Sequence, residues 1–247
     1  MNNSSYGEFA FIYDALTDDV EYEKRADYVK KLIDKHFPGK ASLLCDLGCG
    51  TGTMCKLMNK RGYDVIGVDS SESMLAVASS KSEGQEILYL NQDMTEFELF
   101  GTVDVFLSML DSVNYITEPE SLDKMFSLVK NYLNPEGIFI FDVNSKFKFE
   151  NVLSDNTYTY EVDSIFYSWE NYYEDELLDI YLNFFVENED GTYNRINEHH
   201  MQRYYSDEFI KSLCIKNGFS VEGVYGDLSL DSPCDDCERI FYVIKKN

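Results

Sequence analysis

The sequence predicts an α/β fold: a doubly wound, mostly parallel sheet of seven strands, with an antiparallel β insert before the last two strands. Between residues 43 and 142, short apolar runs typical of buried strands alternate with segments of helical apolar spacing. Such alternation is typical of a parallel sheet with helices on both faces. From residue 149 to 194 the apolar residues instead recur with period two, which indicates antiparallel strands.

The first predicted element is a helix from Val20 to His36, where Tyr28, Leu32 and Ile33 have helical spacing and Pro38-Gly39 ends the pattern. The alternating region follows it. Its predicted strands cover residues 43–47, 64–68, 87–90, 103–108 and 137–142. Its predicted helices cover residues 53–61, 71–80 and 119–133.

The insert differs in composition as well as in period. Residues 149–194 contain twelve acidic and twelve aromatic residues but no Lys or Arg. Tyr158 and Tyr160 alternate with polar residues, and Glu189-Asp190-Gly191 is typical of a hairpin turn. We expect three or four strands up to about Tyr205. A helix capped by Ser206 and two strands, at 220–225 and 239–244, complete the chain.

A glycine-rich loop follows the first strand of the alternating region. The strand ends in Asp46 and continues as Gly48-Cys49-Gly50-Thr51-Gly52 before a helix. Glycines there let a ligand approach the backbone, and the helix start offers unpaired N–H groups. Asp69 ends the next strand, at the distance where a ribose-binding carboxylate is expected. The two features predict a site for a cofactor that contains adenosine.

The details of the loop distinguish between cofactors. A dinucleotide site has the spacing G-x-G-x-x-G beside a pyrophosphate. Here the spacing is G-x-G-x-G, and Asp46 would repel a pyrophosphate. S-adenosylmethionine carries an ammonium and a sulfonium but no phosphate, so it suits this loop better.

The stretch from Asp46 to Gly52 resembles the first motif of the class I S-adenosylmethionine-dependent methyltransferases, and the resemblance covers most of the chain. It implies a Rossmann-like sheet, a ribose-binding Asp69, an adenine-binding Asp93-Met94 and a fourth strand, Val103–Ser108, that ends under the transferred methyl group. The N-terminal stretch from Tyr6 to Asp14 resembles an arm that folds over the cofactor in small-molecule methyltransferases. The cofactor-binding residues that the resemblance implies are Tyr6, Tyr13, Asp46, Gly48, Cys49, Gly50, Gly52, Asp69, Ser70, Met74, Asp93, Met94 and Leu110.

The same resemblance suggests a division of the chain into three parts. Residues 1–40 would form the arm and a helix over the cofactor site. Residues 41–145 and 206–247 would form the cofactor-binding domain, and residues 146–205 an antiparallel cap over the substrate.

Charge and composition restrict the partners. The net charge of −24, from 45 acidic and 21 basic residues, disfavours nucleic acid. No run of eighteen apolar residues or secretory signal is evident, so we expect neither a membrane span nor secretion. Cysteines such as Cys45, Cys55 and Cys214 lie in apolar segments, as buried thiols of a cytoplasmic protein would. The sequence does not predict an oligomeric state.

The acceptor of the methyl group is a small molecule by the same resemblance, which is nearest to the amino-sugar and amino-acid N-methyltransferases. The aromatic and acidic character of the insert favours an amine, because both groups attract a cation. Asp111, His199 or His200 could accept the departing proton, and Asp111 or Asn114 could orient the acceptor.

Other readings remain open at this point. Cys234-Asp235-Asp236-Cys237 could suggest a metal site, but His199 and His200 would face opposite ways on a strand, so we predict a turn and no metal. The chain could also be an adenosyl-ligand sensor without catalysis. An NAD-dependent oxidoreductase is a third alternative, which Asp46 and the loop spacing disfavour.

Overall fold

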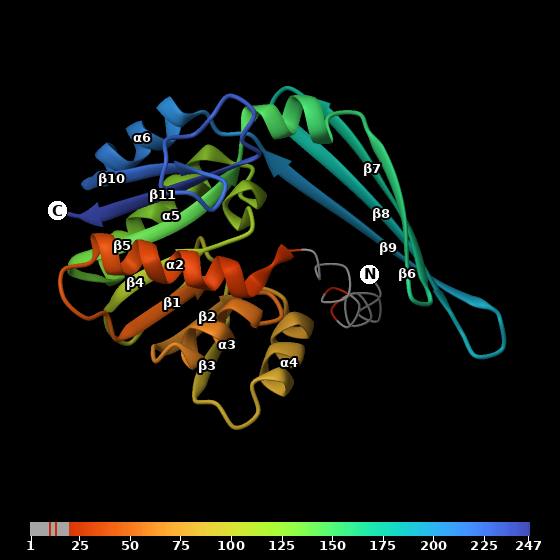
Figure 1. The fold of residues 1–247 in the computed structure, drawn as a ribbon, viewed down its shortest axis with the longest axis horizontal. Coiled ribbons are helices and arrows are strands. Elements are labelled where there is room, and N and C mark those ends of the chain that lie inside the picture. Colours follow the sequence, from red (N-terminus) through yellow and green to blue (C-terminus); the bar gives the residue numbers. More distant parts are fainter. Residues whose placement is uncertain (1–9, 11–12, 14–19) are drawn as a thin grey trace.

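The main sheet has the predicted seven strands, of which six run in the same direction and one, β11, runs in the opposite direction. The computed structural model describes Ala10, Tyr13 and residues 20–247. The order of the strands is β10-β11-β5-β4-β1-β2-β3, and β11 runs antiparallel to both of its neighbours. The strand bounds are β1 Leu43–Leu47, β2 Asp64–Asp69, β3 Ile87–Asn91, β4 Val103–Ser108, β5 Leu133–Asn144, β10 Phe219–Gly226 and β11 Arg239–Lys246. The predicted fold class, a Rossmann-like α/β fold, is confirmed (Figure 1).

Helices cover both faces of this sheet, because alternate side chains of each buried strand point to opposite faces. On one face, Leu44 of β1 and Val105 of β4 pack with helices α2 and α3. On the other face, Cys45 and Phe106 pack with α5 and α6. The helix bounds are α2 Tyr22–His36, α3 Thr53–Lys60, α4 Glu72–Lys81, α5 Pro119–Tyr132 and α6 Asp207–Lys216.

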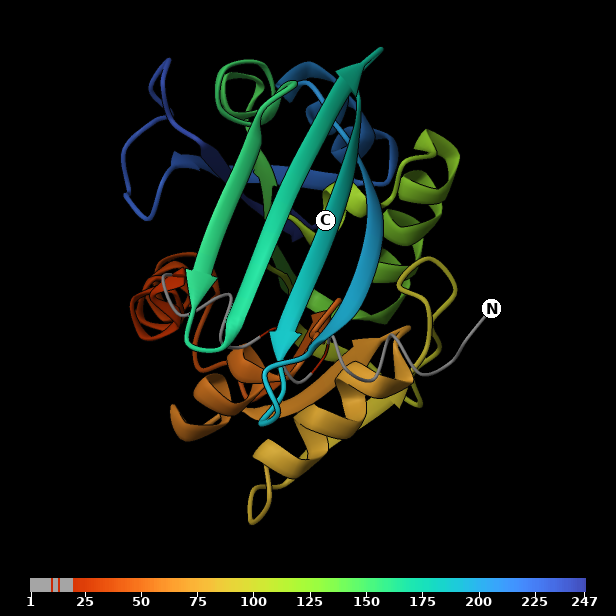
Figure 2. The ribbon, with the colours of Figure 1, turned by 90° about the vertical axis from the view of Figure 1, so that its right-hand side faces the viewer.

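The insert forms a second sheet of four antiparallel strands. They are β6 Thr157–Val162, β7 Ile165–Glu174, β8 Leu177–Glu187 and β9 Tyr193–Arg203, in that order. The hairpin turn predicted at Glu189-Asp190-Gly191 joins β8 to β9. The sheet projects from the core and leans over it (Figures 1 and 2).

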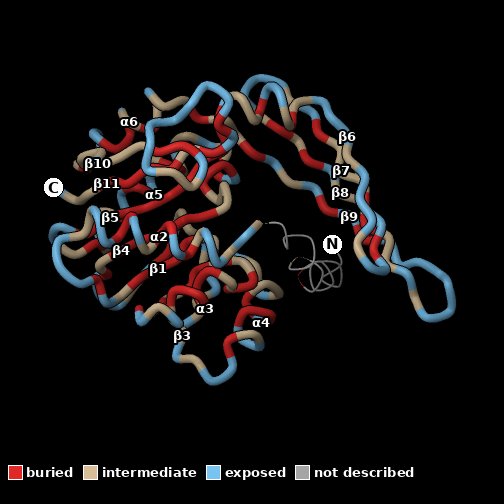
Figure 3. Tube along the Cα trace, in the orientation of Figure 1, coloured by how far each residue is buried: buried red, intermediate tan, exposed pale blue. Residues whose placement is uncertain are grey.

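The two faces of the second sheet differ. The face that contacts the core, here called the inner face, carries Leu178, Ile180 and Phe184 of β8 and Ile196 of β9, all buried (Figure 3). The outer face carries side chains such as Tyr172 and Tyr181, which are 55% and 41% exposed.

Most predicted element bounds agree with the structure to within two residues, but β5 begins earlier than expected. The sequence predicts a strand from residue 137, whereas β5 starts at Leu133, directly after α5. The pairing of β4 with β5 shifts between Val103 and Val105, so β5 passes through Pro135 and Gly137 without ending. Two short helices, η2 Ser112–Tyr115 and η3 Lys148–Leu153, were not predicted because neither is long enough to show a helical period. Among the described residues, no helix is long and apolar enough to cross a membrane.

Candidate active site

The glycine loop lies where β1 ends and α3 begins. Gly48, Gly50 and Gly52 all have positive φ angles, of 72°, 54° and 72°. A Cβ atom at Gly52 would collide with the Tyr89 hydroxyl and lie 2.8 Å from Ala78 Cβ, whereas a Cβ atom at Gly50 would meet no atom within 4 Å. The loop therefore packs tightly below Gly52 and leaves open space beside Gly50, into which a ligand can fit.

Asp69, at the end of β2, anchors this loop. One carboxylate oxygen accepts a hydrogen bond from the backbone N–H of Gly50 and the other from that of Ser71, each at 2.8 Å. Burial raises the pKa of Asp69, against the opposing effect of these two hydrogen bonds. A carboxylate oxygen can accept more than one hydrogen bond, so both oxygens keep capacity for ligand hydroxyl groups.

A pocket of about 310 Å³ opens beside Asp69, along the edge where the parallel strands end. Five of the predicted cofactor-binding residues line it: Gly48, Asp69, Ser70, Asp93 and Met94. The structure adds wall residues that the sequence analysis did not predict, which are Thr95, Tyr115, Ile116, Thr117, Glu118 and Ser121. Asp93 accepts two hydrogen bonds from Thr95, at 2.7 Å each, which fix the turn after β3.

The other predicted cofactor-binding residues in the described part of the chain do not line this pocket. Asp46 is 2% exposed below the glycine loop, where its carboxylate accepts a hydrogen bond from the Cys55 thiol at 3.3 Å. Burial raises the pKa of Asp46 to about 7. Cys49 is buried as well. Contact between the Asp46 carboxylate and a ligand ammonium thus stays a prediction.

Tyr13 and α4 meet the second sheet at this edge. Tyr13 and Met74 pack against the cluster formed by Ile165, Phe184 and their neighbours. Burial raises the pKa of Tyr13 well above its ordinary value, and Tyr22, Tyr115 and Asp111 add to the effect. Tyr13 therefore lies close to the predicted site, whereas Tyr6 lies outside the described residues.

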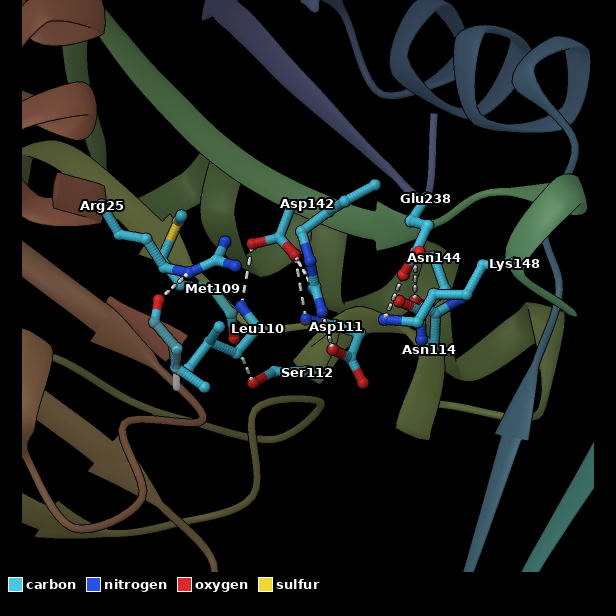
Figure 4. A network of polar contacts seen from close by, with 12 residues as sticks. Arg25, Met109, Leu110, Asp111, Ser112, Asn114, Asp142, Asn144, Lys148 and Glu238 are labelled. Carbon is cyan, nitrogen blue, oxygen red and sulfur yellow. Dashed lines mark hydrogen bonds and ion pairs between the residues drawn. The ribbon is translucent and has the colours of Figure 1, made fainter. Parts of the chain in front are cut away.

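The turn after β4 has an unusual backbone. Leu110 and Asp111 have left-handed conformations, with φ angles of 57° and 56°. Such a conformation costs a non-glycine residue about 1–2 kcal/mol. Both backbone N–H groups donate hydrogen bonds to the carboxylate of Asp142, at 2.8 and 3.0 Å (Figure 4). These hydrogen bonds offset the conformational cost of the turn.

Arg239, the first residue of β11, links this turn to the rest of the sheet. Its guanidinium donates to Asp142 and, at 2.7 Å, to Asp111. Burial opposes the charge of Arg239, but Asp142 and Asp111 raise its pKa above the ordinary value. Gln202 of β9 donates to the other oxygen of Asp111 at 2.6 Å. Both oxygens of Asp111 are thus engaged in this network, and its role toward the acceptor stays a prediction.

Arg25 of α2 is a further residue that the sequence analysis missed. It extends toward the turn after β4, and Asp142 and Asp111 act on its charge (Figure 4). Its Nε donates to the Val20 carbonyl at 2.8 Å, but its buried Nη1 has no hydrogen-bond partner in the described part of the chain. A buried donor without a partner is costly and indicates a place for a ligand acceptor.

The two histidines of β9 point to opposite faces, as predicted. His199 lies on the outer face, where it is stacked on Tyr181 and paired with Asp179 at 2.7 Å. The structure therefore does not bring His199 to the site. His200 lies on the inner face, with its ring 5.8 Å from that of Tyr115, which lines the pocket. Burial lowers the pKa of His200, and the nearby charge of His199 lowers it further.

Asn114 has a structural role. It is fully buried, its amide donates to the Arg203 carbonyl at 2.8 Å, and its oxygen accepts from the N–H of Asn144 at 2.9 Å. The structure thus does not place Asn114 where it could orient an acceptor.

The segment between β10 and β11 contains the turn predicted at Cys234-Asp235-Asp236-Cys237. The two cysteines form a disulfide bond, which the sequence analysis did not predict. Asp227 lies beside it, with the three potential metal-ligand atoms within 4.8 Å of one another. The cysteine sulfurs are already bonded to each other, and Asp227 accepts a hydrogen bond from the N–H of Arg239 at 2.9 Å. The segment thus continues directly into the network around Asp111.

Comparison with known proteins adds to this geometry. Residues 44–137 match the family described as methyltransferase domain. A protein of Geobacillus sp. (strain WCH70) named "putative methyltransferase" is 33% identical over 98% of this chain and 100% of its own length. A crystal structure of an S-adenosylmethionine-dependent methyltransferase from Clostridium acetobutylicum is 32% identical, covers 98% of this chain and 99% of that chain, and has a TM-score of 0.89.

A more distant structure shares the fold alone. It is CalS10, an amino pentose methyltransferase from Micromonospora echinaspora with bound S-adenosylmethionine, which is 18% identical over 96% of this chain and 97% of that chain, with a TM-score of 0.78. The near relatives match almost the whole length. The chain therefore belongs to the class I S-adenosylmethionine-dependent methyltransferases, and its cofactor is S-adenosylmethionine.

Proposed function

We propose that this methyltransferase acts on a small molecule and that the acceptor atom is an amine nitrogen. The observation that carries the proposal is the second sheet, whose inner face contacts the cofactor edge through Met74 and Gln202. A cap at this position suits a molecule that fits between the two sheets better than a folded macromolecule. The aromatic and acidic residues of the insert favour a positively charged ligand.

The residues of the pocket fit the cofactor chemically. Asp69 has acceptor capacity for ribose hydroxyl groups, and the open space at Gly50 admits a ligand close to the backbone. Nη1 of Arg25, which has no hydrogen-bond partner among residues 20–247, suits the carboxylate of the methionine part. Asp93 and Met94 would hold the adenine at the other end of the pocket.

The chain contributes mainly alignment to the reaction. When bound, S-adenosylmethionine supplies a methyl group on a positively charged sulfur, and this methyl passes to the lone pair of the acceptor as the carbon–sulfur bond breaks. Holding two reactants in such an orientation can supply about 7–11 kcal/mol. The rigid turn at Leu110 and Asp111 and the covering second sheet would position the acceptor and exclude water.

The proposal includes a cytoplasmic location and no nucleic-acid partner. Four cysteines are buried free thiols, as is typical of a reducing compartment: Cys45, Cys49, Cys55 and Cys214. The Cys234–Cys237 disulfide is less typical of such a compartment. The net charge of −24 disfavours nucleic acid as substrate.

The test is transfer of a labelled methyl group. Purified protein is incubated with S-adenosylmethionine labelled in the methyl group and with a cell extract, which is then separated by mass. We expect label in a compound of low molecular mass, bound to nitrogen. Label only in RNA or protein would contradict the small-molecule acceptor, and cofactor binding without any transfer would favour a sensor.

A further inference from the structure

One buried carboxylate on the inner face of the second sheet has an oxygen atom that no described residue contacts by a hydrogen bond. Glu198 of β9 is 6% exposed, and its Oε1 has no hydrogen-bond partner in the described part of the chain. Its cross-strand neighbour is Leu182, and the next residues of that face on the two strands include Ile180, Phe184 and Ile196. A lone carboxyl group on an apolar face is costly, and burial accordingly raises the pKa of Glu198.

The position of Glu198 follows from its neighbours along β9. Two residues before it, Ile196 belongs to the cluster that contacts Met74, at the ribose side of the cofactor edge. Four residues after it, Gln202 donates to Asp111 at 2.6 Å, at the side where β4 ends. Residues of one strand face are spaced by about 6.6 Å. Glu198 and His200 therefore lie between two points that are fixed to the cofactor edge.

His200 connects this part of the strand to the pocket. Its ring meets the ring of Tyr115 edge-on, with 5.8 Å between the centroids, and Tyr115 lines the pocket beside Asp69 and Asp93. The inner face of β9 thus continues from Glu198 through His200 to the pocket wall.

We propose that Glu198, with His200 and Tyr115 beside it, forms the subsite that binds the positively charged amine of the methyl acceptor. The inference rests on the proposed function and names the residue that selects an ammonium over a neutral hydroxyl group. An ammonium supplies the donors that Oε1 lacks, and its charge compensates a carboxylate in apolar surroundings. Before transfer, the bound ammonium loses one proton to His200, two residues along the same face of β9, and this frees the nitrogen lone pair that takes the methyl group as the carbon–sulfur bond breaks. The aromatic ring of Tyr115 favours a cation as well.

The test measures selectivity of binding and does not require the natural acceptor. Saturation-transfer NMR is recorded on protein saturated with S-adenosylhomocysteine, for a panel of primary amines and the matching alcohols. We expect some of the amines to bind and their alcohol counterparts not to bind. In Glu198→Gln the affinity for these amines should fall roughly 10- to 100-fold, as expected for loss of a hydrogen bond to a charged group.

Two controls separate binding from folding. Glu170→Gln removes the same charge from the outer face of the same sheet, and it should keep the selectivity. Glu198→Leu fills the position with an apolar side chain. If the carboxyl group is present for binding, this variant should lose the selectivity and have a Tm equal to or above that of the unsubstituted protein. A structural role predicts a lower Tm for both Glu198 variants.

Each outcome bears on the inference. Amines and alcohols that bind alike, an amine panel that does not bind at all, or selectivity that survives in Glu198→Gln would each overturn it. Transfer of labelled methyl to an alcohol would also overturn it, while leaving methyl transfer to a small molecule intact. Failure of the small-molecule proposal looks different, because no compound of low molecular mass would then acquire label from S-adenosylmethionine.

Discussion

Asp69 anchors the glycine loop, since each of its oxygens accepts one backbone hydrogen bond, and it is also the proposed acceptor for the ribose hydroxyl groups. Replacing it with Ala removes the anchor of the glycine loop as well as the predicted ribose acceptor. We expect Asp69→Ala to weaken binding of S-adenosylhomocysteine roughly 10- to 100-fold, measured by isothermal titration calorimetry. Asp64→Asn, at the exposed start of the same strand, is the matched control and should bind normally. Equal affinities of the two variants would contradict the ribose role.

A second prediction concerns Arg25 and the carboxylate of the methionine part of the cofactor. Because its Nη1 has no partner among the described residues, we expect Arg25→Met to weaken binding of S-adenosylhomocysteine by about tenfold or more. Binding of 5′-methylthioadenosine should stay nearly constant, since that nucleoside lacks the carboxylate. Both are measured by calorimetry, with Lys24→Met as the exposed neighbour control. A loss of equal size for both ligands would show that Arg25 acts only on the loop structure.

The raised pKa of Asp46 predicts that the stability of the protein depends on pH. Burial raises its pKa to about 7 in the folded protein, while an unfolded Asp titrates near 3.9. Between these values the folded state holds the proton and the unfolded state does not, so stability falls as pH rises toward 7. The contribution is at most about 1.4 kcal/mol per pH unit. Urea unfolding at several pH values should show a shallower decline for Asp46→Asn than for the unsubstituted protein; identical slopes would contradict a protonated Asp46.

At the scale of elements, the turn after β4 depends on two other strands. Asp142 of β5 and Arg239 of β11 hold Leu110 and Asp111 in left-handed conformations. Arg239→Met leaves the buried carboxylate of Asp142 and the partly buried one of Asp111 without their cation, so we expect a loss of about 3–5 kcal/mol in the free energy of unfolding. Urea denaturation measures it. Lys245→Met, which removes an ion pair at the far end of β11, is the control and should cost less than about 1 kcal/mol.

The same network shows why prediction from sequence succeeded for the strands and failed for their connections. Strands such as Val103–Ser108 are buried on both faces, so a mostly apolar run is enough to locate them. The glycine loop and Asp69 are also local, since they occupy fixed positions along the chain. Arg239 contacts Asp111 across 128 residues of sequence, and no local pattern reports such a pair.

Orientation across the second sheet was predictable only in part. Period two separates the faces correctly, so that Tyr158 and Tyr160 share the inner face and His199 and His200 point to opposite sides. The period does not indicate which face meets the core. Glu198 could therefore not be distinguished from an exposed glutamate until its burial was known.

At the scale of the whole molecule, the net charge of −24 sets the long-range field. Acidic side chains also lie at the pocket, where Asp69, Asp93 and Glu118 line its walls. We expect no shift of RNA or double-stranded DNA in an electrophoretic mobility assay at about 50 mM salt, where electrostatic binding is strong. A basic RNA-binding protein of similar size is the control. A saturable shift that weakens with salt would contradict the predicted exclusion of nucleic acid.

The long separation between Asp111 and Arg239 also has a consequence for how the protein acquires activity. Closing so large a loop carries an entropic cost, and contacts distant in sequence form slowly. The strands around the glycine loop can assemble from neighbouring segments, whereas the left-handed turn must wait until β11 has joined the sheet. During refolding, compactness should therefore return before catalytic competence, and the interval between the two reports on the docking of a single strand.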